Sequence, residues 1–177
     1  MANTKWSVDP THSEVVFKIK HLMISTVTGR FNEFSATAET ASPDSFDNTS
    51  NIEFSANIAS IDTKNEQRDT HLKSDDFFNA EKYPQLTFRG KTLHLNGSEG
   101  TLEGDLTIRE TTRPIALDVE FGGIVTDPYG QTKAGFTLTG KLKRKEFGLN
   151  WNAITEAGNV VVSDEIKLQV EVQFVKQ

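Results

Sequence analysis

The segment IDTKNEQRDTHLKSDDFFNAEKYPQLTF, residues 61–88, is the one long interruption in a chain that otherwise alternates apolar and polar residues. Its apolar residues cluster instead of alternating, and they are Leu72, Phe77, Phe78, Tyr83 and Leu86. Asn65 is suited to cap a short helix, and Pro84 ends any helix and returns the chain to a strand. The segment therefore predicts a short helical lid, near residues 65–79, on a β structure; it could swing to admit a ligand or stay fixed as a plug.

On both sides of this segment the sequence alternates with period two, as strands with one apolar face do. The clearest example is the row from Ile166 to Phe174, in which every second residue is apolar. Residues 96–100 and 126–130 carry Asn, Asp, Gly and Pro in the patterns of tight turns, which join antiparallel strands. The economical arrangement is a sheet curled onto its apolar face. We therefore predict an all-β fold, an antiparallel closed β-barrel of about eight strands, as one domain over residues 1–177.

Three short stretches interrupt the regular alternation of the strands. Val8 opens a predicted edge strand, and Pro10 breaks it where a lost backbone N–H is tolerated. The apolar rows before and after residues 32–33 have opposite parity, so a β-bulge there would turn both rows inward. Residues 42–48 are predicted to form a polar loop.

The composition limits the class of function. The net charge of −6 and the scattered Lys and Arg argue against phosphate contacts, so no nucleic acid is expected as a partner. The chain has no Cys, which removes thiolate catalysis and thiolate metal ligands. No apolar run approaches a membrane span or a signal-peptide core, so we expect no stable membrane insertion. The expected location is cytoplasmic, or periplasmic if a signal peptide has been removed.

The sequence also resembles a known family along most of its length. In the central segment the resemblance rests on Arg68-Asp69, His71-Leu72, Ser74, Asp76-Phe77-Phe78, Tyr83-Pro84 and Phe88. Elsewhere it rests on Trp6, Asp9-Pro10, His12-Ser13, Phe17, His21, Val27, Gly29, Phe31, residues 104–108, Thr112-Arg113-Pro114, Phe147-Gly148-Leu149 and Trp151. These residues are similar to the patterns of the YceI-like family, whose members have a lipocalin-like antiparallel barrel. Glu110-Thr111 departs from the family, which commonly has a glycine where this turn begins.

The resemblance implies a lipid ligand, because members of the family are associated with binding polyisoprenoid or other long-chain lipids. The expected function is to bind, and sequester or carry, a polyisoprenoid, an isoprenoid quinone precursor or a fatty-acid derivative. No catalysis is expected, and no cofactor apart from the bound lipid. The family is mostly bacterial and is often linked to isoprenoid quinones or envelope stress, so lipid transport or storage is the implied role.

The predicted ligand-binding residues face the barrel interior or belong to the lid. They are Phe17, Ile19, His21, Phe31, Phe54, Ile58, Leu72, Phe77, Phe78, Leu106, Ile108, Leu117, Phe121, Phe136, Leu138, Trp151, Leu168 and Val170. Small residues in the inner rows leave room for a ligand, and they are Ala56, Gly104, Ala134 and Gly140. Each methylene removed from water contributes about 0.8 kcal/mol, so a long tail binds without any specific polar contact.

The polar residues of the lid and strand ends have structural interpretations. Arg68 and Asp69 are expected to form an ion pair that anchors the lid, and Asp75-Asp76 to cap a helical turn. The basic run at residues 141–145 is interpreted as the solvated end of a strand, with contact to an anionic lipid headgroup as the alternative.

The four histidines do not form a helical metal-ligand pair, so no metal site is predicted. They are His12, His21, His71 and His94. His21 is expected to be hydrogen-bonded at one end of the barrel.

Two other classes of function stay open. An enzyme acting on an apolar substrate in the same barrel would need a buried titratable group, and His21 is the strongest candidate. A structural β domain without ligand would instead use the edge near Val8 to form a homodimer.

Overall fold

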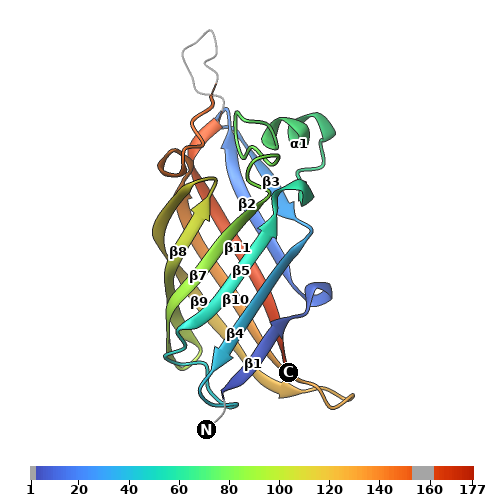
Figure 1. Cartoon of the computed structure of the whole chain (residues 1–177), viewed down its shortest axis with the longest axis vertical. Helices are drawn as coiled ribbons and strands as arrows, with labels where there is room; N and C mark the ends of the chain where they lie inside the picture. The colour runs from blue at the N-terminus through green and yellow to red at the C-terminus, as the bar shows by residue number, and fades with distance from the viewer. Residues whose placement is uncertain (1–2, 153–161) are drawn as a thin grey trace.

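The computed structural model describes residues 3–152 and 162–177, which form a single 11-stranded antiparallel sheet rolled into a tall barrel (Figure 1). The strands are β1 (Thr4–Val8), β2 (Glu14–His21), β3 (Ser25–Phe31), β4 (Phe34–Thr40), β5 (Asn51–Asn57), β6 (Ile61–Asp62), β7 (Gln85–Asn96), β8 (Glu99–Ile108), β9 (Thr111–Thr126), β10 (Thr132–Lys143) and β11 (Val162–Lys176). The helices in this part of the chain are α1 (Glu66–Leu72) and the 3-10 helices η1 (Pro10–His12), η2 (Ile58–Ser60) and η3 (Arg144–Phe147).

The barrel closes because β1 pairs with a strand on each side. Around the wall the order is β1, β4, β5, β7, β8, β9, β10 and β11, and β11 pairs again with β1. The predicted all-β closed barrel of eight antiparallel strands is confirmed. The predicted free edge near Val8 is wrong: Trp6 lies opposite Ala38 of β4 and also opposite Lys176 of β11. A second copy of the chain therefore cannot pair with β1 in the way that was predicted for a dimer.

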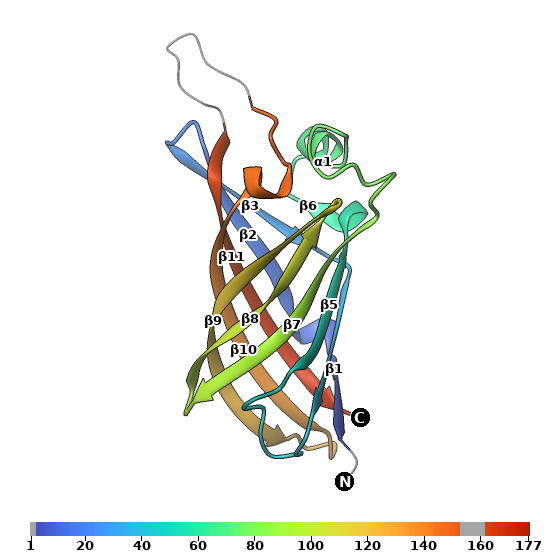
Figure 2. The ribbon, with the colours of Figure 1, turned by 60° about the vertical axis from the view of Figure 1, so that its left-hand side comes forward.

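Three strands lengthen the barrel at the end where α1 lies (Figure 2). β2 continues along β11 beyond the part that pairs with β1, β3 pairs with β2, and β6 pairs with β3. η1 separates β1 from β2, and its cap is Asp9, whose carboxylate accepts from the backbone N–H of Thr11 at 3.0 Å.

Residues 32–33 form a complete break between β3 and β4, where a β-bulge was predicted. The backbone N–H of Asn32 donates to the carbonyl of Ser60, and that of Asn57 donates to the carbonyl of Glu33. η2 and the end of β5 thus satisfy the polar groups of the bend, so the strand ends instead of bulging. The predicted parity is correct, because residues from both β3 and β4 line the barrel interior.

The tight turns predicted at residues 96–100 and 126–130 are present. Gly97 and Gly130 have φ angles of 69° and 85°, which glycine adopts without steric cost. The turn between β8 and β9 has no glycine, and Arg109 takes a φ of 55° there. This turn lies at the same end of the barrel as α1 (Figure 2).

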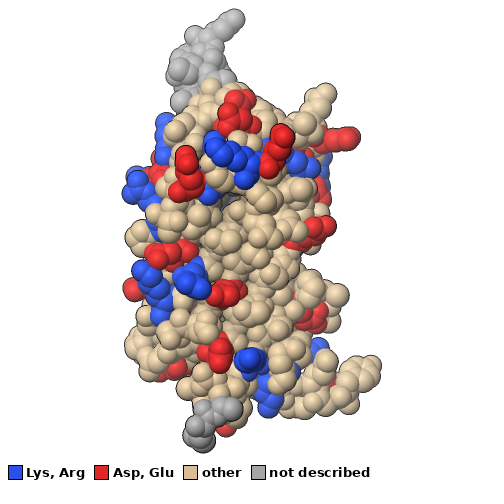
Figure 3. Space-filling view, in the orientation of Figure 1, with Lys and Arg blue, Asp and Glu red and all other residues tan. Residues whose placement is uncertain are grey.

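The outer surface carries charges of both signs. On the face shown in Figure 3, Lys and Arg lie among Asp and Glu over the whole height of the barrel. Exposed ion pairs join neighbouring strands, such as Arg89 with Glu53 and Lys91 with Asp105. No helix in the described ranges combines the length and the apolar character needed to cross a bilayer.

Candidate functional site

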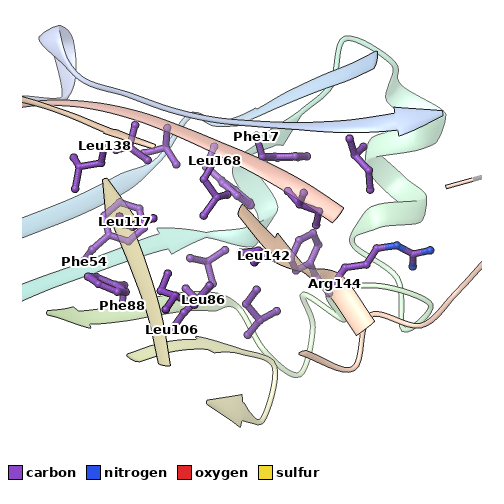
Figure 4. A pocket seen from close by; sticks show the side chains of 18 of the residues that line it. Phe17, Phe54, Leu86, Phe88, Leu106, Leu117, Leu138, Leu142, Arg144 and Leu168 are labelled. Carbon is purple, nitrogen blue, oxygen red and sulfur yellow. The ribbon is translucent and has the colours of Figure 1, made fainter. Parts of the chain in front are cut away.

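A cavity of about 570 Å³ lies inside the barrel. Figure 4 shows apolar side chains from many strands directed toward this space, including Phe54, Phe88 and Leu117. Ligand sites of a few hundred to about a thousand Å³ enclose drug-sized molecules. The interior is therefore open enough for a slender apolar ligand.

Phe46 forms the floor of the cavity. It is 1% exposed, and its ring centroid lies 4.8 Å from that of Trp6 and 4.9 Å from that of Phe136. Phe121 and Phe174 contact the same ring at 6.1 and 6.3 Å. These partners belong to β1, β9, β10 and β11, so one side chain from the loop between β4 and β5 closes the barrel. The sequence predicted only a polar loop here.

The loop that carries Phe46 is fixed from two sides. The backbone N–H of Asn48 donates to the carbonyl of Leu93 in β7 at 2.8 Å. On the other side, the indole N–H of Trp6 donates to the hydroxyl of Thr40 at 3.1 Å. The Thr40 hydroxyl in turn donates to the carbonyl of Ser42 at 2.7 Å, so both sides of the loop are tied to the barrel.

The opposite end of the cavity is covered by α1 and the turns that follow it. Asn65 caps α1 as predicted, accepting from the backbone N–H of Arg68 at 3.0 Å. The predicted ion pair between Arg68 and Asp69 is absent, because both side chains bind Thr63. Arg68 donates to the Thr63 hydroxyl and carbonyl at 2.8 and 2.7 Å, and Asp69 accepts from its backbone N–H at 2.9 Å. Both residues hold α1 against the end of β6.

Arg109 fastens the rest of the lid to the barrel. Its guanidinium donates to the carbonyls of Asp75 and Phe77 at 3.1 Å each, and to the Asp75 carboxylate at 3.0 Å. Its central carbon also lies 5.6 Å from the centre of the Tyr83 ring. A single side chain on the β8–β9 turn thus holds both ends of residues 75–83.

Neither Asp75 nor Asp76 caps a helix, contrary to the prediction. Asp75 binds Arg109, and Asp76 Oδ2 lies 2.8 Å from Nε2 of His71. α1 ends at Leu72, and turns occupy the following residues up to Phe78.

Three aromatic rings meet under the lid. The centroid of His71 lies 4.6 Å from that of Trp151 and 5.1 Å from that of Phe77, while Phe77 and Trp151 are 5.4 Å apart. All three line the cavity. Because Trp151 follows η3, this cluster joins α1 to the chain segment that leads toward β11.

Arg144 is a buried cation in the cavity wall. It is 1% exposed, and Figure 4 places it at the end of the pocket beside the helical ribbon. Its guanidinium donates at 2.7–3.2 Å to the backbone carbonyls of Leu149, Trp151, Val162 and Ser163. Burial lowers the pKa of Arg144, and the carboxylate of Asp164 opposes that effect.

The burial of Arg144 corrects the interpretation of residues 141–145 as a solvated strand end. Lys141, Lys143 and Lys145 are exposed, but Leu142 and Arg144 alternate with them and are buried. The alternation itself was the signal that could have placed Arg144 inside.

The structure brings most of the predicted ligand-binding residues together in the cavity wall. Those in the wall are Phe17, Ile19, His21, Phe31, Phe54, Leu72, Phe77, Phe78, Leu106, Ile108, Leu117, Phe136, Leu138, Trp151, Leu168 and Val170. Two lie elsewhere: Ile58 is buried in η2, and Phe121 stacks on Phe136 at 5.0 Å. Contact of the wall residues with a ligand stays a prediction.

The histidines are spread over the molecule. His21 lines the cavity, and within the described ranges its ring has no hydrogen-bond partner, unlike the prediction. His12 pairs with Asp9 at 2.7 Å, and His94 lies 3.8 Å from Asp47. No three His, Asp or Glu side chains in residues 3–152 and 162–177 are grouped so as to hold a metal ion.

Comparisons with known proteins agree with this architecture. The YceI-like domain model matches residues 6–174. The UPF0312 protein of Staphylococcus epidermidis is 37% identical over 174 residues, which is 97% of each chain.

Solved structures show the same barrel. The YCEI protein of Campylobacter jejuni is 38% identical, with a TM-score of 0.73 over 90% of this chain and 91% of that chain. A structure described as a polyisoprenoid binding domain from Saccharophagus degradans is 14% identical and shares the fold, with a TM-score of 0.73 over 97% and 98% of the two chains. The family match and the relatives cover nearly all of the chain, and the protein belongs to the YceI-like family.

Proposed function

We propose that this protein binds a long-chain apolar lipid inside its barrel and sequesters or carries it without catalysis. The candidate ligands are a polyisoprenoid, an isoprenoid quinone precursor and a fatty-acid derivative. The observation that carries the proposal is the apolar cavity of about 570 Å³, with Phe46 at its floor and α1 at its cover. The polyisoprenoid-binding description of a protein with the same fold supports it.

The energetics favour a ligand with a long tail. Burial of about a dozen methylenes contributes roughly 10 kcal/mol, at about 0.8 kcal/mol each. Association and ordering of the tail offset several kcal/mol of this gain. With a cost of at least about 4 kcal/mol, a dozen methylenes leave at most about 6 kcal/mol, and each further methylene adds about 0.8 kcal/mol, so tight binding favours longer tails.

Access to the cavity requires the lid to move. Phe77 and Phe78 are buried parts of the lid and line the cavity, so their displacement would widen the path of a tail into the barrel. Since Arg109 holds the residues around them, release of that side chain is the step that opens the barrel.

Native mass spectrometry of the freshly purified protein tests this function, followed by organic extraction of what dissociates. We expect a stoichiometric adduct with the mass of a prenyl or acyl lipid. The matched variant Leu138→Trp fills the cavity and should reduce the adduct, whereas Val125→Trp, at an exposed site, should not. A protein that stays free of adduct when prenyl and acyl lipids are offered would contradict the proposal.

The same samples test the absence of catalysis. After prolonged incubation, the extracted lipid should have the mass of the lipid supplied, both for the unaltered protein and for His21→Gln. A product that forms with the unaltered protein and not with His21→Gln would point to an enzyme.

A further inference from the structure

The ionisable groups of the cavity wall lie on elements at its lid end. Lys20 and His21 end β2, Arg68 and His71 belong to α1, and Arg144 begins η3. Contacts tie these elements together: the carbonyl of Val162, which lies opposite His21, accepts from Arg144, and the ring of Trp151 packs on His71. The rest of the wall is almost entirely apolar.

These charges have one sign. Lys20, Arg68 and Arg144 are cations, and among the described residues no Asp or Glu lines the cavity. The excess is unexpected in a chain whose net charge is −6. On the outer face in Figure 3, by contrast, positive and negative groups are intermingled.

The nearby carboxylates hydrogen-bond to other groups, although Asp164 also acts on Arg144 through its charge. Asp69 accepts from Thr63, and Asp164 accepts from the backbone N–H of Lys145 at 3.1 Å. Asp76 pairs with His71. Within the described ranges, none of the three wall cations has a carboxylate oxygen within 4.0 Å.

The three cations differ in which of their N–H groups lack a hydrogen-bond partner. Four of the five N–H groups of Arg144 donate to backbone carbonyls, so Arg144 contributes chiefly positive potential. Arg68 uses Nε and Nη2 on Thr63, and its Nη1 has no partner in the described part of the chain. The ammonium group of Lys20 has none there either. Nη1 of Arg68 and Nζ of Lys20 are therefore available to a ligand.

We propose that the ligand carries an anionic head, a carboxylate or a phosphate, which binds at the lid end between Lys20 and Arg68. This inference rests on the proposed lipid-binding function and names the class of ligand. The apolar wall strengthens the attraction of the half-buried Arg68 and the buried Arg144 for an anion, whereas the exposed Lys20 acts at the rim through water. The tail fills the apolar part of the barrel, and the head neutralises the excess charge at the rim.

The test compares three ligands of equal tail length: hexadecanoate, hexadecyl phosphate and hexadecanamide. Binding to the full-length, delipidated protein is measured by calorimetry at low salt. We expect at least one of the two anions to bind about tenfold more tightly than the amide, which corresponds to about 1.4 kcal/mol. The preference should shrink as salt is added. A preference limited to the phosphate identifies a phosphate head, and one limited to the carboxylate identifies a fatty acid.

Variants of Lys20 and Arg68 test whether these two residues cause the preference for an anionic head over the amide. Lys20→Met leaves the lid contacts intact and should reduce the preference about threefold; with Arg68→Met added, it should nearly vanish. Amide affinity should stay unchanged in Lys20→Met, which reports that the cavity is intact. In the double variant the contacts of Arg68 with Thr63 are also lost, so the readout there is the ratio of anion to amide affinity. The control pair Lys18→Met and Lys64→Met removes two exposed cations that do not line the cavity and should preserve the preference.

Two outcomes would overturn the inference. Equal affinity for amide and anions would refute the anionic head while leaving the lipid-binding function in place. A preference that survives in the Lys20→Met and Arg68→Met double variant would refute the assigned site. Failure of all three ligands to bind would instead contradict the proposed function itself.

Discussion

Arg109 Nη2 lies 3.0 Å from Asp75 Oδ1, so the tip of the β8–β9 hairpin is joined to a lid residue 34 positions earlier. The ion pair alone contributes little, because the side chain of Asp75 is 81% exposed. The same guanidinium also donates to the exposed carbonyl of Asp75 and to the partly buried carbonyl of Phe77, and these two bonds fix the direction of the lid backbone. They also account for an arginine at a φ of 55°, where glycine would be less strained.

Arg109→Gly should therefore loosen the lid without unfolding the barrel. Relief of about 1 kcal/mol of backbone strain offsets part of the lost contacts, so the free energy of unfolding should change by less than about 1 kcal/mol. Hydrogen exchange at residues 73–84 should accelerate, and a bound lipid should dissociate several times faster.

The control for this variant is Arg89→Ala, which removes an exposed ion pair with Glu53 on the barrel wall. It should leave both the exchange rates and the lipid dissociation rate unchanged. Unaltered protection of the lid in Arg109→Gly would show that Arg109 does not hold it.

Phe46→Ala should strongly destabilise the barrel. Removing a fully buried Phe side chain costs about 3–5 kcal/mol, and four other aromatic rings lose their shared partner here. Urea unfolding at neutral pH measures the change. Phe34→Ala, which removes a half-buried ring stacked on Phe54, should cost clearly less. Equal losses for the two variants would contradict the role of Phe46 as the floor.

Gly29→Ala should reduce the space for ligand with little loss of stability. A Cβ at Gly29 would overlap the ring of its cross-strand partner Phe17, and the free cavity allows that ring to swing inward. Lipid uptake should fall by at least threefold. Gly135→Ala is the matched control, because nothing lies within 4 Å of the added Cβ there. Normal uptake by Gly29→Ala would show that the Phe17 ring moves elsewhere.

Asp9 makes part of the stability depend on pH. Hydrogen bonds from Thr11 and His12 lower the pKa of Asp9 from 3.8 to about 2. A lowered pKa stabilises the folded state above the unfolded value of 3.8, and this stabilisation is lost as the pH falls from there toward 2. The shift corresponds to about 2 kcal/mol, or about 1 kcal/mol after solvent screening.

Asp9→Asn should therefore lower the free energy of unfolding by about 1 kcal/mol at pH 7. The difference from the unaltered protein should narrow between pH 4 and pH 2 in urea titrations. Asp44→Asn, in an exposed loop, should show no such pH-dependent difference. A difference in the free energy of unfolding between Asp9→Asn and the unaltered protein that stays constant down to pH 2 would contradict a lowered pKa of Asp9.

The barrel was predictable because period-two alternation and turn chemistry are local properties. The break at residues 32–33 was not, because it depends on backbone bonds to Ser60 and Asn57, which lie more than twenty residues away. The same applies to β1: its second partner, β11, is at the other end of the chain, and no local pattern near Val8 reports that pairing.

The residues of the cavity wall could be predicted from strand parity, but the residues that close its two ends could not. Phe46 is a lone aromatic residue in a polar loop, and only the assembled barrel provides the four rings that bury it. Arg144 shares the parity of Leu142, yet a buried guanidinium is acceptable only where carbonyls satisfy it. Those carbonyls come from residues 149–163, so the tertiary structure decides its place.

The floor at Phe46 gives the barrel a direction. Because Phe46 closes one end, a lipid would enter tail first at the lid end, and its head would leave first by the same end. If the barrel holds a lipid as proposed, tails shorter than the distance from Phe46 to the lid would leave empty space above Phe46, and longer tails would displace the lid. Chain length would thus be recorded in the position of α1, at the outer surface.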